Sequence, residues 1–346
     1  MKYFLFVLFS MFIPNSVMAG DIKITPMEGF PSSERGYELG VSACYAGCIE
    51  DMLIMAGGAN FADKPVAEGG KKCFYKGIYG AKITSYDTLC WEKIGELPKA
   101  LAYGATVSLG NRLIFIGGAT AEGSVSSVFS VELKDGKAVV NQLPSLPVAL
   151  DNISATIYNN MVYVAGGSSN GEEQNTVFLL DTKKSDAQWE IQKEYLCVPQ
   201  RERIGMQTVS VAPNGKLMIL GGFSNADDSH SAEVYDGPSG GALAQLCDGR
   251  IFIAGGVNHE IFLDAISGRY EKVAKADYLK KPVEWYRFDG RLQLFDPEDC
   301  SYTTLMESPF LARAGAALVG YKEMIFSIGG ETKPGVRSPL VVKVSL

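Results

Sequence analysis

A short apolar segment that ends in a pair of glycines recurs six times along the chain, and this repeat constrains the fold more than any other feature. The copies are DMLIMAGG at 51–58, RLIFIGG at 112–118, MVYVAGG at 161–167, KLMILGG at 216–222, RIFIAGG at 250–256 and MIFSIGG at 324–330. No GxxxxGK[ST] phosphate loop accompanies them. We therefore expect the glycines to provide positive φ or close packing where a strand leaves its sheet.

Other strands recur in phase with the Gly-Gly strand. An inner strand with small residues precedes it, as at 104–110, and a third strand that often ends in Asp follows it, as at 82–87. Outer strands are expected at 90–98, 138–147, 188–199 and 302–309. This unit resembles the kelch repeat, and six copies of it predict an all-β fold, a six-bladed kelch-type β-propeller.

The two ends of the chain and one short repeat predict departures from a regular propeller. The last repeat shows no outer strand before Leu346, whereas residues 22–31 have the character of one, so the N-terminal strand is expected to close the ring. Gly222 and Gly256 are only 34 residues apart, so one blade is expected to lack its outer strand. An insertion at 260–288 is expected to hold a short helix.

The N-terminus has the pattern of a secretory signal peptide. Lys2 is followed by an apolar run from Tyr3 to Ile13 and by the small-residue site Val17-Met18-Ala19. We interpret residues 1–19 as the signal peptide and 20–346 as a single propeller domain, which is expected to be exported to the periplasm. No later segment approaches the roughly 20 apolar residues of a transmembrane helix, so no membrane span is expected.

Charge and composition argue against several classes of function. Residues 20–346 contain 31 basic and 39 acidic residues, a formal charge of −8, which disfavours a nucleic-acid partner. With only His230 and His259, and with seven cysteines in no ligand-like spacing, neither a metal nor another cofactor is expected. No GxSxG nucleophile elbow is present.

Loops that open on one face of a propeller bring distant polar residues together. The loops after the Gly-Gly strands carry Asn60, Asn258, Glu331 and Arg337, and those before the inner strands carry Arg203 and Arg313. Arginines around a concave mouth favour a small carboxylated sugar, because a guanidinium binds carboxylate in a bidentate manner. The expected substrate-binding residues are Arg203, Asn258, Arg313 and Asn60.

Beyond the repeat, the chain resembles the N-acetylneuraminate epimerase (sialic acid mutarotase) family, including its cyclically permuted members. The resemblance lies in segments near 40–61, 101–123, 249–262 and 308–338, and GGETKPGVR at 329–337 is its most specific part. It implies that Glu331 and Arg337 are the catalytic pair. One departure is Leu101, where relatives often have Arg before Ala-Tyr-Gly.

The resemblance implies an exported enzyme that equilibrates the α and β anomers of N-acetylneuraminate by acid–base ring opening and closure. Glu331 is expected to be the base and Arg337 to hold the sugar carboxylate. A non-catalytic kelch module that binds a glycan or a protein is the alternative, and a structural Glu331–Arg337 ion pair is the corresponding alternative for the site. A homodimer is the default expectation for the assembly.

Overall fold

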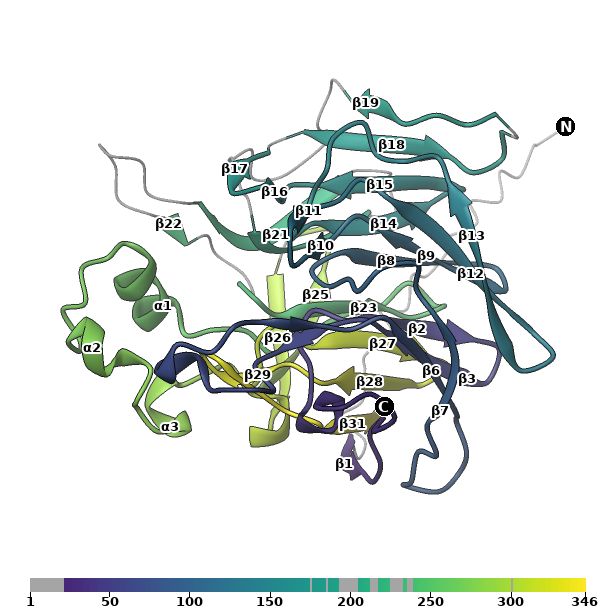
Figure 1. Cartoon of the computed structure of the whole chain (residues 1–346). Helices are drawn as coiled ribbons and strands as arrows, with labels where there is room; N and C mark the ends of the chain where they lie inside the picture. The colour runs from purple at the N-terminus through teal and green to yellow at the C-terminus, as the bar shows by residue number, and fades with distance from the viewer. Residues whose placement is uncertain are drawn as a thin grey trace, which may run out of the picture.

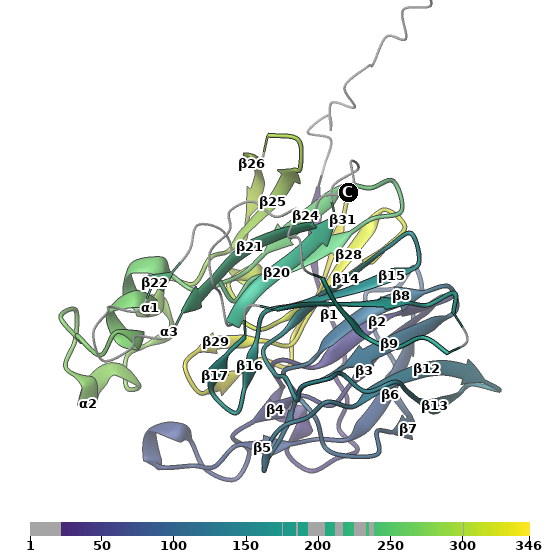
Figure 2. The ribbon, with the colours of Figure 1, turned by 90° about the horizontal axis from the view of Figure 1, so that it is seen from above.

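The computed structural model describes residues 22–346 except 175, 185, 193–204, 212–216, 225–232, 235–238 and 300. Antiparallel sheets follow one another around a central axis and form a β-propeller (Figure 1, Figure 2). The inner strands of successive sheets contact each other, in the order β2, β8, β14, β20, β23 and β27, and β27 returns to β2. No helix in the described ranges is long and apolar enough to cross a membrane.

Five blades have four strands each. The first contains β2 (Tyr45–Ile49), β3 (Met52–Ala56), β6 (Gly77–Lys82) and β7 (Glu92–Glu96). The second contains β8 (Ala105–Leu109), β9 (Arg112–Ile116), β12 (Val128–Lys134) and β13 (Lys137–Leu143). The third contains β14 (Ser154–Tyr158), β15 (Met161–Ala165), β18 (Val177–Asp181) and β19 (Glu190–Gln192).

The two remaining four-stranded blades come from the C-terminal part of the chain and from its N-terminal strand. One contains β23 (Ala242–Gln245), β24 (Ile251–Ala254), β25 (Arg291–Asp296) and β26 (Ser301–Glu307). The other contains β27 (Ala317–Tyr321), β28 (Met324–Ile328), β31 (Val341–Ser345) and β1 (Lys23–Met27). Outer strands are therefore present in all four regions where the repeat predicted them.

The sheet between the third blade and the blade of β23 is incomplete, and it corrects the predicted blade count. It contains β20 (Gly205–Val211), β21 (Leu217–Ser224) and the two-residue β22 (Glu233–Val234). β22 pairs only with Phe223 and Ser224, at the end of β21 and beyond its glycine pair. The described residues thus form five complete blades, not six, with a hairpin and one short strand at the remaining position.

The N-terminal strand closes the ring as predicted. β1 pairs antiparallel with β31 from Lys23 opposite Ser345 to Met27 opposite Val341. Beyond β1, the Glu28 carbonyl accepts a hydrogen bond from Leu89 N in the first blade, at 2.8 Å. The first strand of the propeller therefore joins its last blade to its first.

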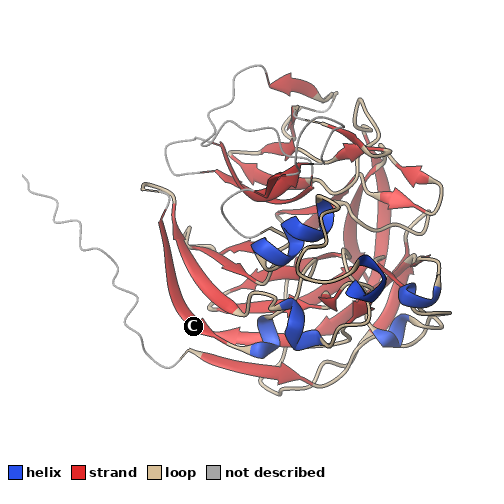
Figure 3. Ribbon diagram, turned by 90° about the vertical axis from the view of Figure 1, so that its left-hand side faces the viewer, coloured by secondary structure: helices blue, strands red, loops and turns tan. Residues whose placement is uncertain are grey.

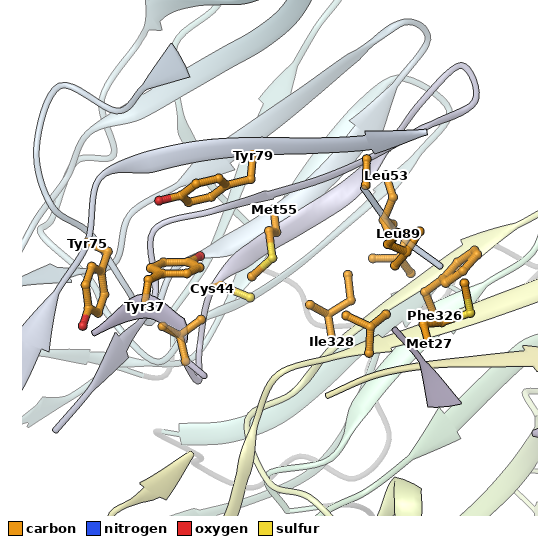
Figure 4. Packing of buried hydrophobic residues seen from close by; sticks show 14 residues of the cluster. Met27, Tyr37, Cys44, Leu53, Met55, Tyr75, Tyr79, Leu89, Phe326 and Ile328 are labelled. Atoms are coloured by element: carbon orange, nitrogen blue, oxygen red, sulfur yellow. The ribbon is translucent and has the colours of Figure 1, made fainter. Parts of the chain in front are cut away.

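The core lies between neighbouring blades. One cluster combines Leu53 and Met55 of the first blade with Met27, Phe326 and Ile328 of the last (Figure 4). Such contacts bury the apolar faces that a single blade cannot cover by itself. Both glycines of all six pairs have positive φ, as the repeat predicted.

Short elements cover the face on which the Gly-Gly strands end. Four hairpins follow the glycine pairs: β4 (Ala59–Asn60) with β5 (Cys73–Phe74), β10 (Ala119–Thr120) with β11 (Gly123–Ser124), β16 (Ser168–Ser169) with β17 (Glu172–Glu173), and β29 (Glu331–Lys333) with β30 (Val336–Arg337). The insertion forms three short helices, α1 (His259–Ile266), α2 (Lys275–Tyr278) and α3 (Val283–Tyr286), where one was predicted (Figure 3). Single-turn 3-10 helices span Tyr37–Leu39, Val66–Glu68 and Pro309–Leu311.

Candidate functional site

The residue that follows a glycine pair has the same backbone environment in several repeats. It forms an antiparallel bridge with the residue three positions before the first residue of the inner strand. The bridged pairs are Ala59 with Ser42, Ala119 with Ala102, Ser168 with Asp151, and Glu331 with Ala314. In three of these four repeats the position holds Ala or Ser, whereas in the last it holds a carboxylate. Among the four repeats that form this bridge, Glu331 is therefore the one charged residue at this position, and a comparison of the repeats with one another can show it.

A chain of backbone hydrogen bonds fixes the loops around the axis. Asn152 N donates to Tyr103 O, Tyr103 N to Ala43 O, Ala43 N to Gly315 O, and Gly315 N to Gly240 O, at 2.7–2.9 Å. Asn152, Tyr103 and Ala43 have positive φ, as do both glycines. All five line an axial cavity of about 350 Å³, which Glu331 also lines. The mouth of the channel is thus built from tightly connected backbone, which holds the neighbouring side chains in register.

Glu331 and Arg337 are cross-strand partners in the β29–β30 hairpin. Arg337 Nη1 lies 3.1 Å from Glu331 Oε1, and the Gly335 N–H donates to the same oxygen. Arg337 Nε donates to Ser42 Oγ at 2.9 Å, and the guanidinium lies 5.1 Å from the centre of the Phe61 ring. The arginine side chain is only 5% exposed, so the pair is held inside the protein.

The environment of Glu331 alters its protonation. Burial raises the pKa of its carboxyl above the usual value, and the nearby Arg337 charge partly opposes this rise. Lys72 also acts to lower the pKa of Glu331, which places a second cation near the site. The Lys72 ammonium lies 4.4 Å from the centre of the Tyr103 ring, at the channel mouth. Lys72 is not among the site residues that the sequence predicted. Its position directly before β5, in the loop that follows the Gly57-Gly58 pair, is a signal that could have indicated it.

Asn258 lies close to Glu331 in a second cavity. Its side-chain Oδ1 caps α1 by accepting a hydrogen bond from Ile261 N at 3.1 Å. Asn258 and Glu331 both line a cavity of about 330 Å³ beneath the insertion. The structure thus brings together three of the expected site residues: Glu331, Arg337 and Asn258.

Asn60 is in a different environment from the one expected of a substrate contact. It is buried, and its Nδ2 donates to the carbonyls of Gly36 and Gly40 at 2.8 Å. Its Oδ1 accepts a hydrogen bond from the Tyr75 hydroxyl at 2.9 Å. This geometry supports a structural role, because the amide forms hydrogen bonds with Gly36, Gly40 and Tyr75 inside the protein.

Arg313 likewise has its donors directed into the protein. It is 2% exposed, and its guanidinium donates to the carbonyls of Gly329, Leu340 and Ser327 and to the Ser327 hydroxyl. It lines neither of the two cavities. The expectation that Arg313 binds substrate is therefore not supported by its position, and Arg203 lies outside the described residues.

The described part of the chain contains no group of three or more His, Cys, Asp or Glu residues that could hold a metal ion. Five of the seven cysteines lie in that part, and they are free thiols: Cys44, Cys48, Cys73, Cys90 and Cys247.

Known proteins resemble this chain in sequence and in fold. The sequence model of the N-acetylneuraminate epimerase family matches residues 17–140 and 236–346, which include Glu331, Arg337, Lys72 and the insertion. N-acetylneuraminate epimerase 1 from Escherichia coli O6:H1 is 25% identical over 231 residues, 59% of each chain. N-acetylneuraminate epimerase from Escherichia coli K12 is 26% identical over 233 residues, 58% of this chain and 60% of the relative.

These alignments span about three fifths of the length of the curated relatives. A solved structure titled "Structure of YjhT" superposes with a TM-score of 0.58 at 14% identity, covering 92% of this chain and 95% of that one, which supports the propeller fold. The family model covers well over half of the sequence, in two segments that contain the Glu331–Arg337 hairpin, the first blade and most of the second. The chain belongs to the N-acetylneuraminate epimerase family.

Proposed function

We propose that the protein is a sugar epimerase that interconverts the α and β anomers of N-acetylneuraminate. The observation that carries the proposal is the position of Glu331. Its carboxylate lies between two cavities, and burial raises its pKa. A carboxylate with a raised pKa is a stronger base than an ordinary one, and a pKa closer to the working pH suits a group that must both take up and release a proton. The names of the curated relatives and of the family support the choice of reaction and sugar.

To open the ring, the reaction transfers one proton and breaks one carbon–oxygen bond. The same two changes in reverse close the ring again. Glu331 removes the proton of the anomeric hydroxyl, the bond between the anomeric carbon and the ring oxygen breaks, and its electron pair remains on the ring oxygen. The protonated Glu331 carboxyl then gives its proton to that oxygen. The resulting ketone rotates, and the hydroxyl then attacks its other face as the proton steps reverse. The overall reaction consumes no proton and needs no redox partner.

Two cations lie near Glu331, and their positive charge can attract the carboxylate of the sugar. Arg337 is tied to Glu331 and Ser42, so in this proposal it orients the base and supplies a fixed positive charge. Lys72 lies at the channel mouth beside Tyr103, where its ammonium can reach an incoming anion. We also propose that residues 1–19 direct export, which would place this activity in the periplasm.

The test follows the α-to-β conversion of freshly released N-acetylneuraminate by proton NMR. The wild-type protein should accelerate the conversion over buffer, and Glu331→Gln should remove roughly 10²-fold or more of that acceleration, the usual contribution of a general base. Lys72→Ala should raise KM more than it lowers kcat. Glu298→Gln is the matched control, because Glu298 is exposed in the turn between β25 and β26.

Two outcomes would contradict the proposal. A wild-type protein that leaves the rate equal to that in buffer is not an epimerase for this sugar. Saturable binding of the sugar that is unchanged in Glu331→Gln, without any acceleration, would instead identify a non-catalytic binding module.

A further inference from the structure

The cavity beneath the insertion is separate in character from the axial cavity, although the two meet at Glu331 and Ala314. Its volume is about 330 Å³. Most of its wall is apolar or aromatic, and its principal lining side chains are Ile261, Phe262, Ala265, Tyr278, Tyr286 and Phe288. Asn258 and Glu331 bring side-chain amide and carboxyl groups to this wall. Ring opening at Glu331 makes no use of this apolar space.

The wall of the cavity is firmly held. Lys333 Nζ, from the Glu331 hairpin, donates to the Lys281 carbonyl in the insertion at 2.7 Å. The Tyr286 hydroxyl donates to the Tyr278 carbonyl, and the two rings meet edge to face with centroids 5.5 Å apart. Tyr286 is 1% exposed. Figure 1 shows α3 beside β29, so the insertion and the hairpin enclose the space together.

Asn258 supplies a polar group of defined orientation. Because its Oδ1 accepts the Ile261 N–H, this atom must be the amide oxygen, and Nδ2 is then the donor on the other branch. Among the described residues, none accepts a hydrogen bond from Nδ2. A ligand that combines a carbonyl oxygen with an apolar tail complements this donor and the aromatic wall.

We propose that this cavity binds the N-acyl group of the sugar, with the acyl carbonyl on Asn258 Nδ2 and the alkyl end against the aromatic wall. The inference rests on the proposed function, because it places the sugar ring at Glu331. A water molecule occupies about 30 Å³ in the liquid, so a cavity of about 330 Å³ has room for more than an acetyl group. The cavity therefore accepts acyl chains longer than acetyl.

The test compares neuraminic acids that carry N-acetyl, N-propanoyl, N-butanoyl and N-pentanoyl groups. Affinity for the Glu331→Gln variant is measured by calorimetry, and mutarotation by the wild-type protein is followed by proton NMR. Each added methylene should tighten binding by up to about fourfold while the cavity has space, which is the effect of burying one methylene. Ala265→Phe, which fills the cavity, should remove this gain, and the pentanoyl sugar should lose at least tenfold in affinity.

The control places the same side chain elsewhere in the insertion. Ala274→Phe substitutes an exposed alanine that does not line the cavity, and it should keep the dependence on chain length. Asn258→Asp retains the acceptor that caps α1 and removes the donor, so it should weaken binding of all four sugars.

Failure of this inference is distinguishable from failure of the proposed function. Affinity that does not increase with chain length, or equal effects of Ala265→Phe and Ala274→Phe, overturns the subsite even if the wild-type protein accelerates mutarotation. Affinity that increases with chain length without acceleration retains the subsite and overturns the epimerase. A protein that binds none of the four sugars overturns both.

Discussion

At the scale of single residues, Glu331 shows how one different side chain in a repeat can supply an acid–base group. Its backbone position follows a glycine pair, and in the three other repeats that form the same bridge this position holds Ala59, Ala119 and Ser168. Those small residues are compatible with a crowded channel mouth, whereas a carboxylate there is partly removed from water. The result is a group whose charge is disfavoured by burial and favoured by Arg337.

The first prediction concerns the pH dependence of the reaction. Because burial raises the pKa of Glu331, its basic form is lost as the pH falls through a value above 4.5, the ordinary value for Glu. The enzymatic rate, after subtraction of the rate in buffer, should therefore decline at a pH above 4.5. Arg337→Ala removes the charge that lowers this pKa, so the decline should move to higher pH. A decline at or below 4.5, or a shift to lower pH in Arg337→Ala, would contradict the assignment of the base.

At the scale of elements, Arg313 joins the residues before β27 to β28 and to the start of β31. Its guanidinium donates to the carbonyls of Gly329, Leu340 and Ser327. Without these donors the Gly329 carbonyl would lose a buried hydrogen bond, whereas the Leu340 carbonyl would still accept from Gly329 N. Unsatisfied carbonyls in a dry interior are costly, typically about 1–3 kcal/mol each. The arginine therefore fixes the backbone that leads into Glu331.

The second prediction follows from this role. Arg313→Lys should lower the free energy of unfolding by about 3 kcal/mol, because one ammonium cannot reproduce the planar set of donors. Urea denaturation measures the change, and the KM of the folded fraction should stay close to that of the wild type. Arg291→Lys is the control: Arg291 pairs with Asp289 at an exposed site, so little stability is at stake. Unchanged stability with a raised KM would instead return Arg313 to substrate binding.

The strands were predictable from the sequence because the same alternation of strands and turns recurs in each copy of the repeat. The roles of the loop residues were harder to predict. Repeat phase places Asn60 and Arg313 near one face, but it does not reveal whether a side chain points to solvent or to buried carbonyls. That choice depends on neighbouring segments such as Gly36–Gly40 and Ser327–Gly329, which approach only in the folded propeller. The three hydrogen-bonding partners of Asn60 are likewise set by tertiary structure.

At the scale of the whole molecule, the sequence predicted six blades, one of them without its outer strand, whereas the described residues form five blades and an incomplete sheet. The segment 231–236 has a strand-like pattern. Within the described residues of that segment, Glu233 and Val234 pair with β21, beyond Gly221 and Gly222. Strand propensity shows that a segment can pair, whereas the register depends on the geometry of the connecting loop. The cavity at Glu331 was also beyond prediction, because its two sides come from an insertion and a hairpin about 50 residues apart.

The ring as a whole depends on a strand contributed by the other end of the chain, and this gives the last prediction. Removal of residues 20–28 deletes β1, so β31 loses its partner along Val341–Ser345 and becomes an unprotected edge. It also deletes the Glu28–Leu89 hydrogen bond to the first blade and the buried side chain of Met27.

The deletion should therefore lower the urea midpoint strongly and promote association, which light scattering detects. Met27→Ala, which keeps the strand, should cost about 2–3 kcal/mol without association. Lys23→Ser, at an exposed position of the same strand, should leave both properties unchanged. A deletion variant with the wild-type midpoint would show that the remaining blades hold the ring closed by themselves, and that the pairing of β1 with β31 contributes little to its stability.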